Sequence, residues 1–172
     1  MPRETQAARM AAPAATRGGY ASPPPSGGDE KTTVKTRFGV IEFDLNQALT
    51  FPKAIPGFVG YQSFGLAMIP SETQSSFMLL QALEPDDLSF IVLPYDHAAG
   101  LIDAKDVVSA QQSLGIAPAD CAIMLIATFR RMGGSFETSV NMRAPIFIDT
   151  TKRLAWQYIL PNDRYEVRHT LA

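Results

Sequence analysis

The residues that could carry metal or acid–base chemistry are few in this 172-residue chain. It contains two histidines, His97 and His169, and one cysteine, Cys121, all far apart in the sequence. Zinc sites use His and Cys ligands at short, recurring spacings, and none of these three residues has such a neighbour. The sequence therefore predicts no metal and no cofactor.

Three carboxylates lie close together, at Glu84, Asp86 and Asp87. Paired carboxylates can perform acid–base catalysis. Pro85 and Asp86 favour a turn, however, and the acids of a turn between strands are ordinarily solvated. The chain also has no glycine-rich phosphate loop and no Gly-x-Ser-x-Gly motif. We therefore expect a protein that is not an enzyme, and keep as an alternative a small-ligand β-barrel whose pocket these acids line.

The single cysteine and the apolar runs bear on the compartment. Cys121 opens an apolar strand, which favours a core position, and a lone cysteine cannot form an internal disulfide. No apolar run approaches the roughly 18 residues of a membrane span. The start of the chain has no continuous apolar segment typical of a secretory signal. These features predict a cytoplasmic protein without a membrane partner.

Short strands dominate the elements that must position these residues. In residues 40–45 apolar and polar side chains alternate, which places Ile41, Phe43 and Leu45 on one face of a strand. Glycine, proline and acidic turn residues separate most of the candidates. The predicted strands are 33–36, 40–45, 65–69, 77–83, 89–93, 121–129, 139–142, 145–148 and 154–160.

One segment has helical signals. Asp103 can cap a helix over 104–114, and Gly115 is a suitable stop. Many short strands with one helix predict a mainly β chain, a small barrel-like or sandwich-like single domain. Residues 1–32 are rich in Ala, Pro and Gly and lack Ile, Leu, Val and Phe, which predicts a disordered tail before a folded domain over 33–172.

Charge is unevenly distributed, although the formal net charge is only −2. From Glu42 to Asp120 there are ten acids against two bases, whereas from Cys121 onward there are seven bases against four acids. Nucleic-acid binding needs a positive track, so the acidic middle argues against it. An acidic segment suits a basic protein partner, although acids that only keep a β protein soluble give the same pattern.

Two segments are candidate partner-binding surfaces. Pro52 and Pro56 stiffen the stretch that carries Phe51, Ile55 and Phe58, whose side chains either plug the end of the barrel or form a rigid binding ridge. Near the C-terminus, Tyr165 and Arg168 are residue types that anchor interfaces, and His169 can add a pH-sensitive contact. The competing interpretation packs Tyr165 on the barrel and pairs Arg168 with Asp163. Asn141 and Arg143 are further candidates, because the two positions alternate along an extended chain and therefore lie on one face.

Five motifs together resemble the FliW family of flagellar assembly factors. Leu49-Thr50-Phe51-Pro52-Lys53-Ala54-Ile55-Pro56-Gly57-Phe58 is similar to the family's Phe-Pro-x-Gly-Ile-Pro-Gly-Phe, with Ala54 in place of a usual glycine. The family's Asn-Leu-x-Ala-Pro-Ile and terminal Tyr-x-x-Arg-His have counterparts that begin at Asn141 and Tyr165. The five motifs lie in residues 36–43, 49–58, 80–92, 140–149 and 165–169.

The resemblance implies a role in partner switching, without a cofactor. Proteins of this family bind the carbon storage regulator CsrA, a basic RNA-binding dimer, and relieve its repression of flagellin translation. They also bind flagellin, which competes for them. The resemblance therefore predicts CsrA and flagellin as partners. From the charge pattern, we expect Asp86 and Asp87 to be among the contacts to the basic dimer. A flagellin-binding chaperone without a role in RNA regulation is the alternative.

Overall fold

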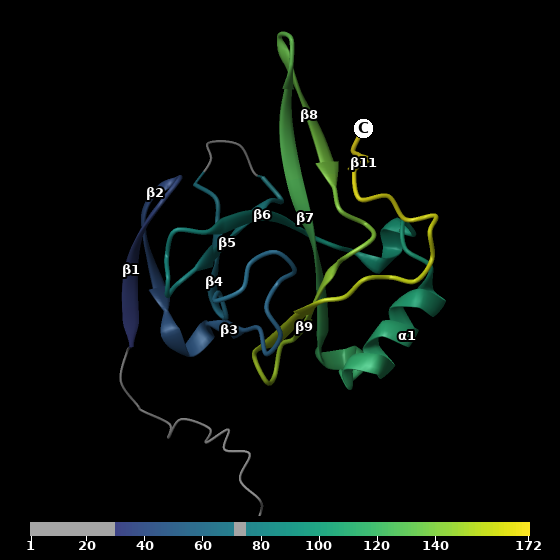
Figure 1. Ribbon diagram of the computed structural model, residues 1–172, viewed down its shortest axis with the longest axis horizontal. Coiled ribbons are helices and arrows are strands. Elements are labelled where there is room, and N and C mark those ends of the chain that lie inside the picture. Colours follow the sequence, from purple (N-terminus) through teal and green to yellow (C-terminus); the bar gives the residue numbers. More distant parts are fainter. Residues whose placement is uncertain (1–29, 71–74) are drawn as a thin grey trace, which may run out of the picture.

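The computed structural model describes residues 30–70 and 75–172 (Figure 1). Most of the predicted tail, residues 1–29, lies outside these described residues. The strands are β1 (Lys31–Thr36), β2 (Gly39–Asp44), β3 (Leu49–Thr50), β4 (Ser63–Met68), β5 (Met78–Ala82), β6 (Ser89–Pro94), β7 (Cys121–Met132), β8 (Ser135–Val140), β9 (Ile146–Asp149), β10 (Leu154–Gln157) and β11 (His169–Thr170). Besides α1 (Ala104–Leu114), three 3-10 turns are described, η1 (Leu45–Gln47), η2 (His97–Ala99) and η3 (Pro118–Asp120).

The larger sheet closes into a barrel. Its nine strands follow the order β11-β8-β7-β6-β5-β4-β3-β10-β9, and the first residues of β7 also pair with β9, from Cys121↔Asp149 to Met124↔Ile146. Strands β7, β6, β5, β4, β3, β10 and β9 therefore form a ring, which leaves no open edge among them. The mainly β, barrel-like fold with one helix, as predicted, is confirmed.

Beyond the ring, the outer half of β7 pairs with β8 to form a long hairpin, here called the arm (residues 127–140). It projects from the barrel at the top of Figure 1, and β11 pairs with its base through His169↔Val140 and Thr170↔Ser139. From the sequence, the first of these strands was predicted to end at Phe129 and the second to begin at Ser139. Both bounds were wrong, because β7 continues to Met132 and β8 begins at Ser135. The cross-strand ladder from Phe129↔Thr138 to Met132↔Ser135 holds these additional residues in strand conformation.

The predicted helix is confirmed at both ends. The Asp103 carboxylate accepts a hydrogen bond from the backbone N–H of Lys105, and Gly115 takes a left-handed conformation with φ 69°. Val107 and Ala110 of α1 are buried against Phe147 and its neighbours, forming one half of the core. The other half fills the barrel interior around Phe51, Phe64, Leu80 and Ile146.

The hairpin of β1 and β2 forms a separate two-stranded sheet that contacts the barrel at β4. The prediction that Leu45 lies in this strand, on one face with Ile41 and Phe43, was wrong. Asp44 accepts a hydrogen bond from the backbone N–H of Asn46, so the chain turns into η1 and Leu45 is exposed. Phe43 is buried, and its ring lies over Gly65.

Changing Gly65 to alanine should lower the free energy of unfolding by about 1–3 kcal/mol, as overpacking of a filled core does. A Cβ at this position would lie 2.3 Å from Cδ1 of Phe43, so the buried ring must move. Chemical denaturation measures the change. Gly134→Ala is the matched control, since an added Cβ there has open space around it. Equal stability of the two variants would show that Phe43 does not fix the hairpin to β4.

Candidate protein-interaction surfaces

The arm has two chemically different faces because side chains alternate along its strands. One face carries Thr128 and Arg130 with their cross-strand partners Ser139 and Glu137. The opposite face carries Phe129 and Arg131 with their partners Thr138 and Phe136. The arm is therefore polar on one side and partly aromatic on the other.

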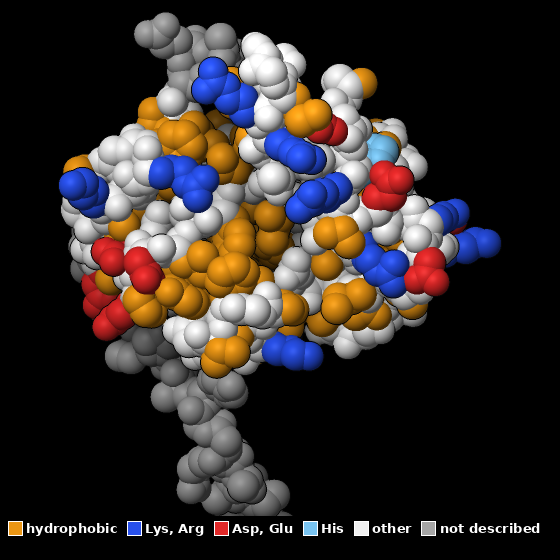
Figure 2. All heavy atoms as spheres, turned by 45° about the horizontal axis from the view of Figure 1, so that its top comes forward, with side chains coloured by type: hydrophobic (Ala, Val, Ile, Leu, Met, Phe, Trp, Pro, Cys, Tyr) orange, Lys and Arg blue, Asp and Glu red, His pale blue; other side chains and the backbone are white. Residues whose placement is uncertain are grey.

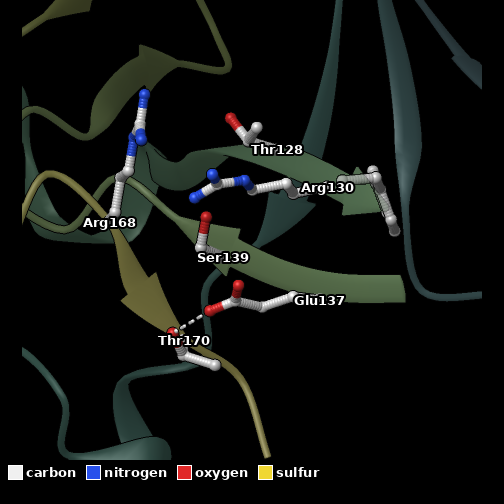
Figure 3. A pocket seen from close by; sticks show the side chains of 7 residues that line it. Thr128, Arg130, Glu137, Ser139, Arg168 and Thr170 are labelled. Carbon is white, nitrogen blue, oxygen red and sulfur yellow. Dashed lines mark hydrogen bonds between the residues drawn. The ribbon is translucent and has the colours of Figure 1, made fainter. Parts of the chain in front are cut away.

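The polar face of the arm borders a pocket of about 410 Å³ (Figure 3). Thr128, Ser139 and Thr170 form one row across three strands, and the pocket is also lined by Arg130 and Arg168. The Thr170 hydroxyl donates a hydrogen bond of 3.0 Å to Glu137, as Figure 3 shows. Two guanidinium groups beside hydroxyls suit a carboxylate or another oxyanion, whereas the carboxylate of Glu137, which also lines the pocket, opposes one.

The aromatic face of the arm borders an open apolar groove of about 490 Å³, here called the aromatic groove. Phe77 and Phe129 meet edge to face, with ring centroids 5.1 Å apart. Figure 2 shows hydrophobic side chains exposed on the end of the molecule from which the arm projects, with Lys and Arg side chains among them. The residues that line the groove are Phe38, Ile69, Ser75, Phe77, Ile91, Phe129 and Phe136.

The aromatic groove was not predicted from the sequence. Its residues come from five separate stretches of the chain, so no local spacing reveals it. The usable signal is in the arm, where Phe129 and Phe136 flank Gly133 and Gly134 at positions that share one face of an extended hairpin.

The acidic turn comprises residues 84–87 and is exposed, as predicted for a turn between strands. Asp87 accepts a hydrogen bond of 2.8 Å from the Tyr61 hydroxyl, and this bond to a negative group raises the pKa of Tyr61. The buried Gln81 side chain donates to the backbone carbonyl of Asp86. The turn is therefore fixed from both sides, while the carboxylates of Glu84, Asp86 and Asp87 face solvent.

The segment with the two prolines places two of its three large apolar side chains in the core. Phe51 and Ile55 are buried inside the barrel, where the Phe51 ring packs edge to face on Phe64 with a centroid distance of 5.0 Å. Phe58 is half-buried and packs on Phe90. Of the three proposed ridge residues, only Phe58 has exposed surface that a partner could contact directly.

Tyr165 fastens the C-terminal segment to the start of α1. Its ring is 3% exposed, and its hydroxyl donates to the Asp106 carboxylate while accepting from the backbone N–H of Asp103 at 2.9 Å. Arg164 also donates to this hydroxyl and pairs with Asp103 at 3.1 Å. The bond from Lys105 N–H, and then the one from Arg164, lower the pKa of Asp103.

The other predicted contact residues occupy different surroundings. Arg168 is exposed and lines the pocket of Figure 3, and His169 is half-buried in β11 with Nδ1 3.7 Å from Glu166. The alternative pairing of Arg168 with Asp163 was wrong. Asp163 instead pairs with Arg143 at 2.7 Å, because the chain after β10 returns beside Arg143.

Asn141 has a local structural bond. Its side-chain carbonyl accepts from the backbone N–H of Ala144 at 3.0 Å, which shapes the turn into β9. Cys121 is partly buried, and this burial raises the pKa of its thiol. A raised pKa keeps the thiol protonated near neutral pH and therefore weakly nucleophilic.

Two negative findings apply to residues 30–70 and 75–172 only. No group of three or more His, Cys, Asp or Glu side chains there is arranged to hold a metal ion. No helix in the same part of the chain has the length and apolar character needed to cross a membrane.

Together the fold and these surfaces define a small β-barrel protein with exposed patches suited to contacts with other proteins. A family model described as "FliW protein" matches residues 32–171, so the chain belongs to the FliW family. Its relatives are flagellar assembly factors, as the resemblance predicted.

Individual relatives agree with this membership. The chain is 30% identical to the flagellar assembly factor FliW of Caldicellulosiruptor bescii over 152 residues, which cover 83% of this chain and 91% of that protein. It is 31% identical to the one of Thermotoga maritima, with 80% and 91% covered. A crystal structure of the flagellar assembly factor FliW superposes with a TM-score of 0.61 at 26% identity, covering 82% of this chain and 96% of that chain.

Proposed function

We propose that this flagellar assembly factor binds the translational regulator CsrA in the cytoplasm, opposes its repression of flagellin translation, and binds flagellin as the competing partner. Membership of the FliW family over residues 32–171 supports the flagellar role. The proposal requires protein-binding surfaces and no catalytic group.

The observation that carries the CsrA half is the exposed acidic turn. Its three carboxylates face solvent, and Tyr61 and Gln81 hold the turn in place. A fixed negative patch attracts a basic dimer over distances comparable with the Debye length, about 8 Å at physiological salt. Such attraction acts mainly on the rate of association.

Reversing both Asp86 and Asp87 to lysine should lower the association rate with a CsrA-type regulator by about ten-fold or more at low salt. The reason is the loss of attraction to the basic dimer, so raising the salt concentration should slow the wild type and narrow the difference. Surface plasmon resonance at two ionic strengths measures both effects, and thermal melting checks that the variant is folded.

A pair of single reversals provides the control. Asp86→Lys and Glu166→Lys change the net charge equally, and both side chains are exposed. Only Asp86→Lys should slow association. An unchanged rate in the double variant would make these acids ordinary solvated turn residues.

A pull-down with the full chain from a motile culture tests the function as a whole. Recovery of both a CsrA-type regulator and flagellin is the expected result. Recovery of flagellin alone would favour a chaperone without a role in RNA regulation.

A further inference from the structure

We propose that the aromatic groove binds an amphipathic segment of a partner protein, one whose bulky apolar side chains are flanked by carboxylates. This inference deepens the proposed function. It rests on that function only in naming the natural partner, which is flagellin and not the basic regulator CsrA. The chemistry of the occupant follows from the residues that line and flank the groove.

The groove is assembled from several parts of the fold that are far apart in the sequence. Phe38 comes from the β1–β2 turn, Phe77 precedes β5, Ile91 lies in β6, and Phe129 and Phe136 come from the arm. Arg37 ties the β1–β2 turn to the barrel, since its Nε donates to the Ser89 hydroxyl at 3.1 Å. A pocket that is already formed costs little conformational entropy on binding.

Two aromatic side chains of the groove are exposed to solvent, which favours a binding role. Phe136 is 72% exposed and Phe129 is 41% exposed, both on the projecting arm. Exposed contiguous apolar surface on a soluble protein marks an interaction site. Aromatic side chains in such a site commonly supply most of the binding energy.

Among the described residues, two arginines lie beside the groove. Arg131 lies directly across the ladder from Phe136 and on the same face of the arm, and it forms no ion pair within the part of the chain that the structure describes. Arg37 is exposed beside Phe38. These cations favour carboxylates in the occupant and disfavour a basic partner.

The chain itself is a poor occupant. The sequence of residues 1–29 contains no Ile, Leu, Val or Phe and more bases than acids. A second copy docking groove to groove would bring its own Arg37 and Arg131 against the same residues, which is unfavourable in a two-fold contact. A partner segment with acidic flanks avoids both problems.

The test uses two synthetic amphipathic peptides, with leucines at helical i, i+3, i+4 and i+7 positions and either glutamates or lysines between them. With the full-length protein, the glutamate peptide should bind at least about five-fold more tightly than the lysine peptide. In nitrogen-15 spectra, the amide signals of Phe77, Phe129 and Phe136 should shift. Light scattering should show an unchanged protein mass, since a concentration-dependent dimer through the groove would overturn the proposal.

Two variants and a control sharpen the test. Phe136→Ser should weaken the glutamate peptide by about ten-fold or more, and Arg131→Glu should abolish the preference for glutamate over lysine. Val59→Ser is the control, because Val59 is 88% exposed and does not line the groove. Failure of the glutamate peptide to bind, or equal binding to wild type and Phe136→Ser, would overturn the proposal.

Purified flagellin separates this inference from the proposed function. If the glutamate peptide binds in the groove but flagellin does not bind the wild type, the groove stands and the flagellin partner is wrong. If flagellin binds wild type and Phe136→Ser equally, the flagellin partner stands and the groove proposal is wrong. Loss of flagellin binding in Phe136→Ser alone supports both.

Discussion

Replacing Tyr165 with alanine should lower the free energy of unfolding by about 3–5 kcal/mol, as loss of a buried aromatic ring does. The ring is part of the core around α1, and the hydroxyl accepts a hydrogen bond from the backbone N–H of Asp103. Denaturant titration followed by circular dichroism measures the loss. Removal of the ring should also weaken the pairing of the C-terminal strand β11 with β8, since β11 begins four residues later.

Tyr165→Phe separates the ring from the hydroxyl. It keeps the packed ring and removes the bonds to Asp103 and Asp106, so the expected loss is about 1–3 kcal/mol. Val167→Ala, at an exposed position in the same segment, should change stability by less than about 0.5 kcal/mol. A Tyr165→Ala protein with wild-type stability and no partner binding would instead place Tyr165 in the interface.

Phe51→Ala should also cost about 3–5 kcal/mol. The ring is 0% exposed, fills the barrel interior and packs edge to face on Phe64, and such aromatic pairs add about 0.5–1.5 kcal/mol beyond buried area. Any loss of partner binding by this variant should therefore follow the fraction of unfolded protein. Chemical denaturation and binding measured on the same sample establish whether the two losses coincide.

Val59→Ala is the control for Phe51, since Val59 directly follows the same segment but is exposed. It should leave stability unchanged. Should Phe51→Ala remain fully folded yet fail to bind CsrA or flagellin, the segment would be a binding ridge after all, and its burial would have to be relieved on binding.

The site was only partly predictable from sequence. Arg168 and the acidic turn were identified as charged candidates. Arg168 lines a pocket, and the acidic turn is exposed to solvent. Tyr165 was left between two interpretations, because an aromatic residue near a chain end has the same local pattern whether it packs or binds. Its partners, Asp103 and Asp106, lie about sixty residues away in the chain.

Local signals fixed those features that depend on neighbours in the chain. Asp103 and Gly115 bound α1 because a cap and a left-handed stop act within one turn, and alternation marked most strands because a sheet has one buried face. Only the tertiary structure decided the closure of β7 on β9, the burial of Phe51 and Ile55, and the gathering of Phe38, Phe77 and Phe136 into one groove. Each of these depends on pairing between segments far apart in sequence, which no local periodicity encodes.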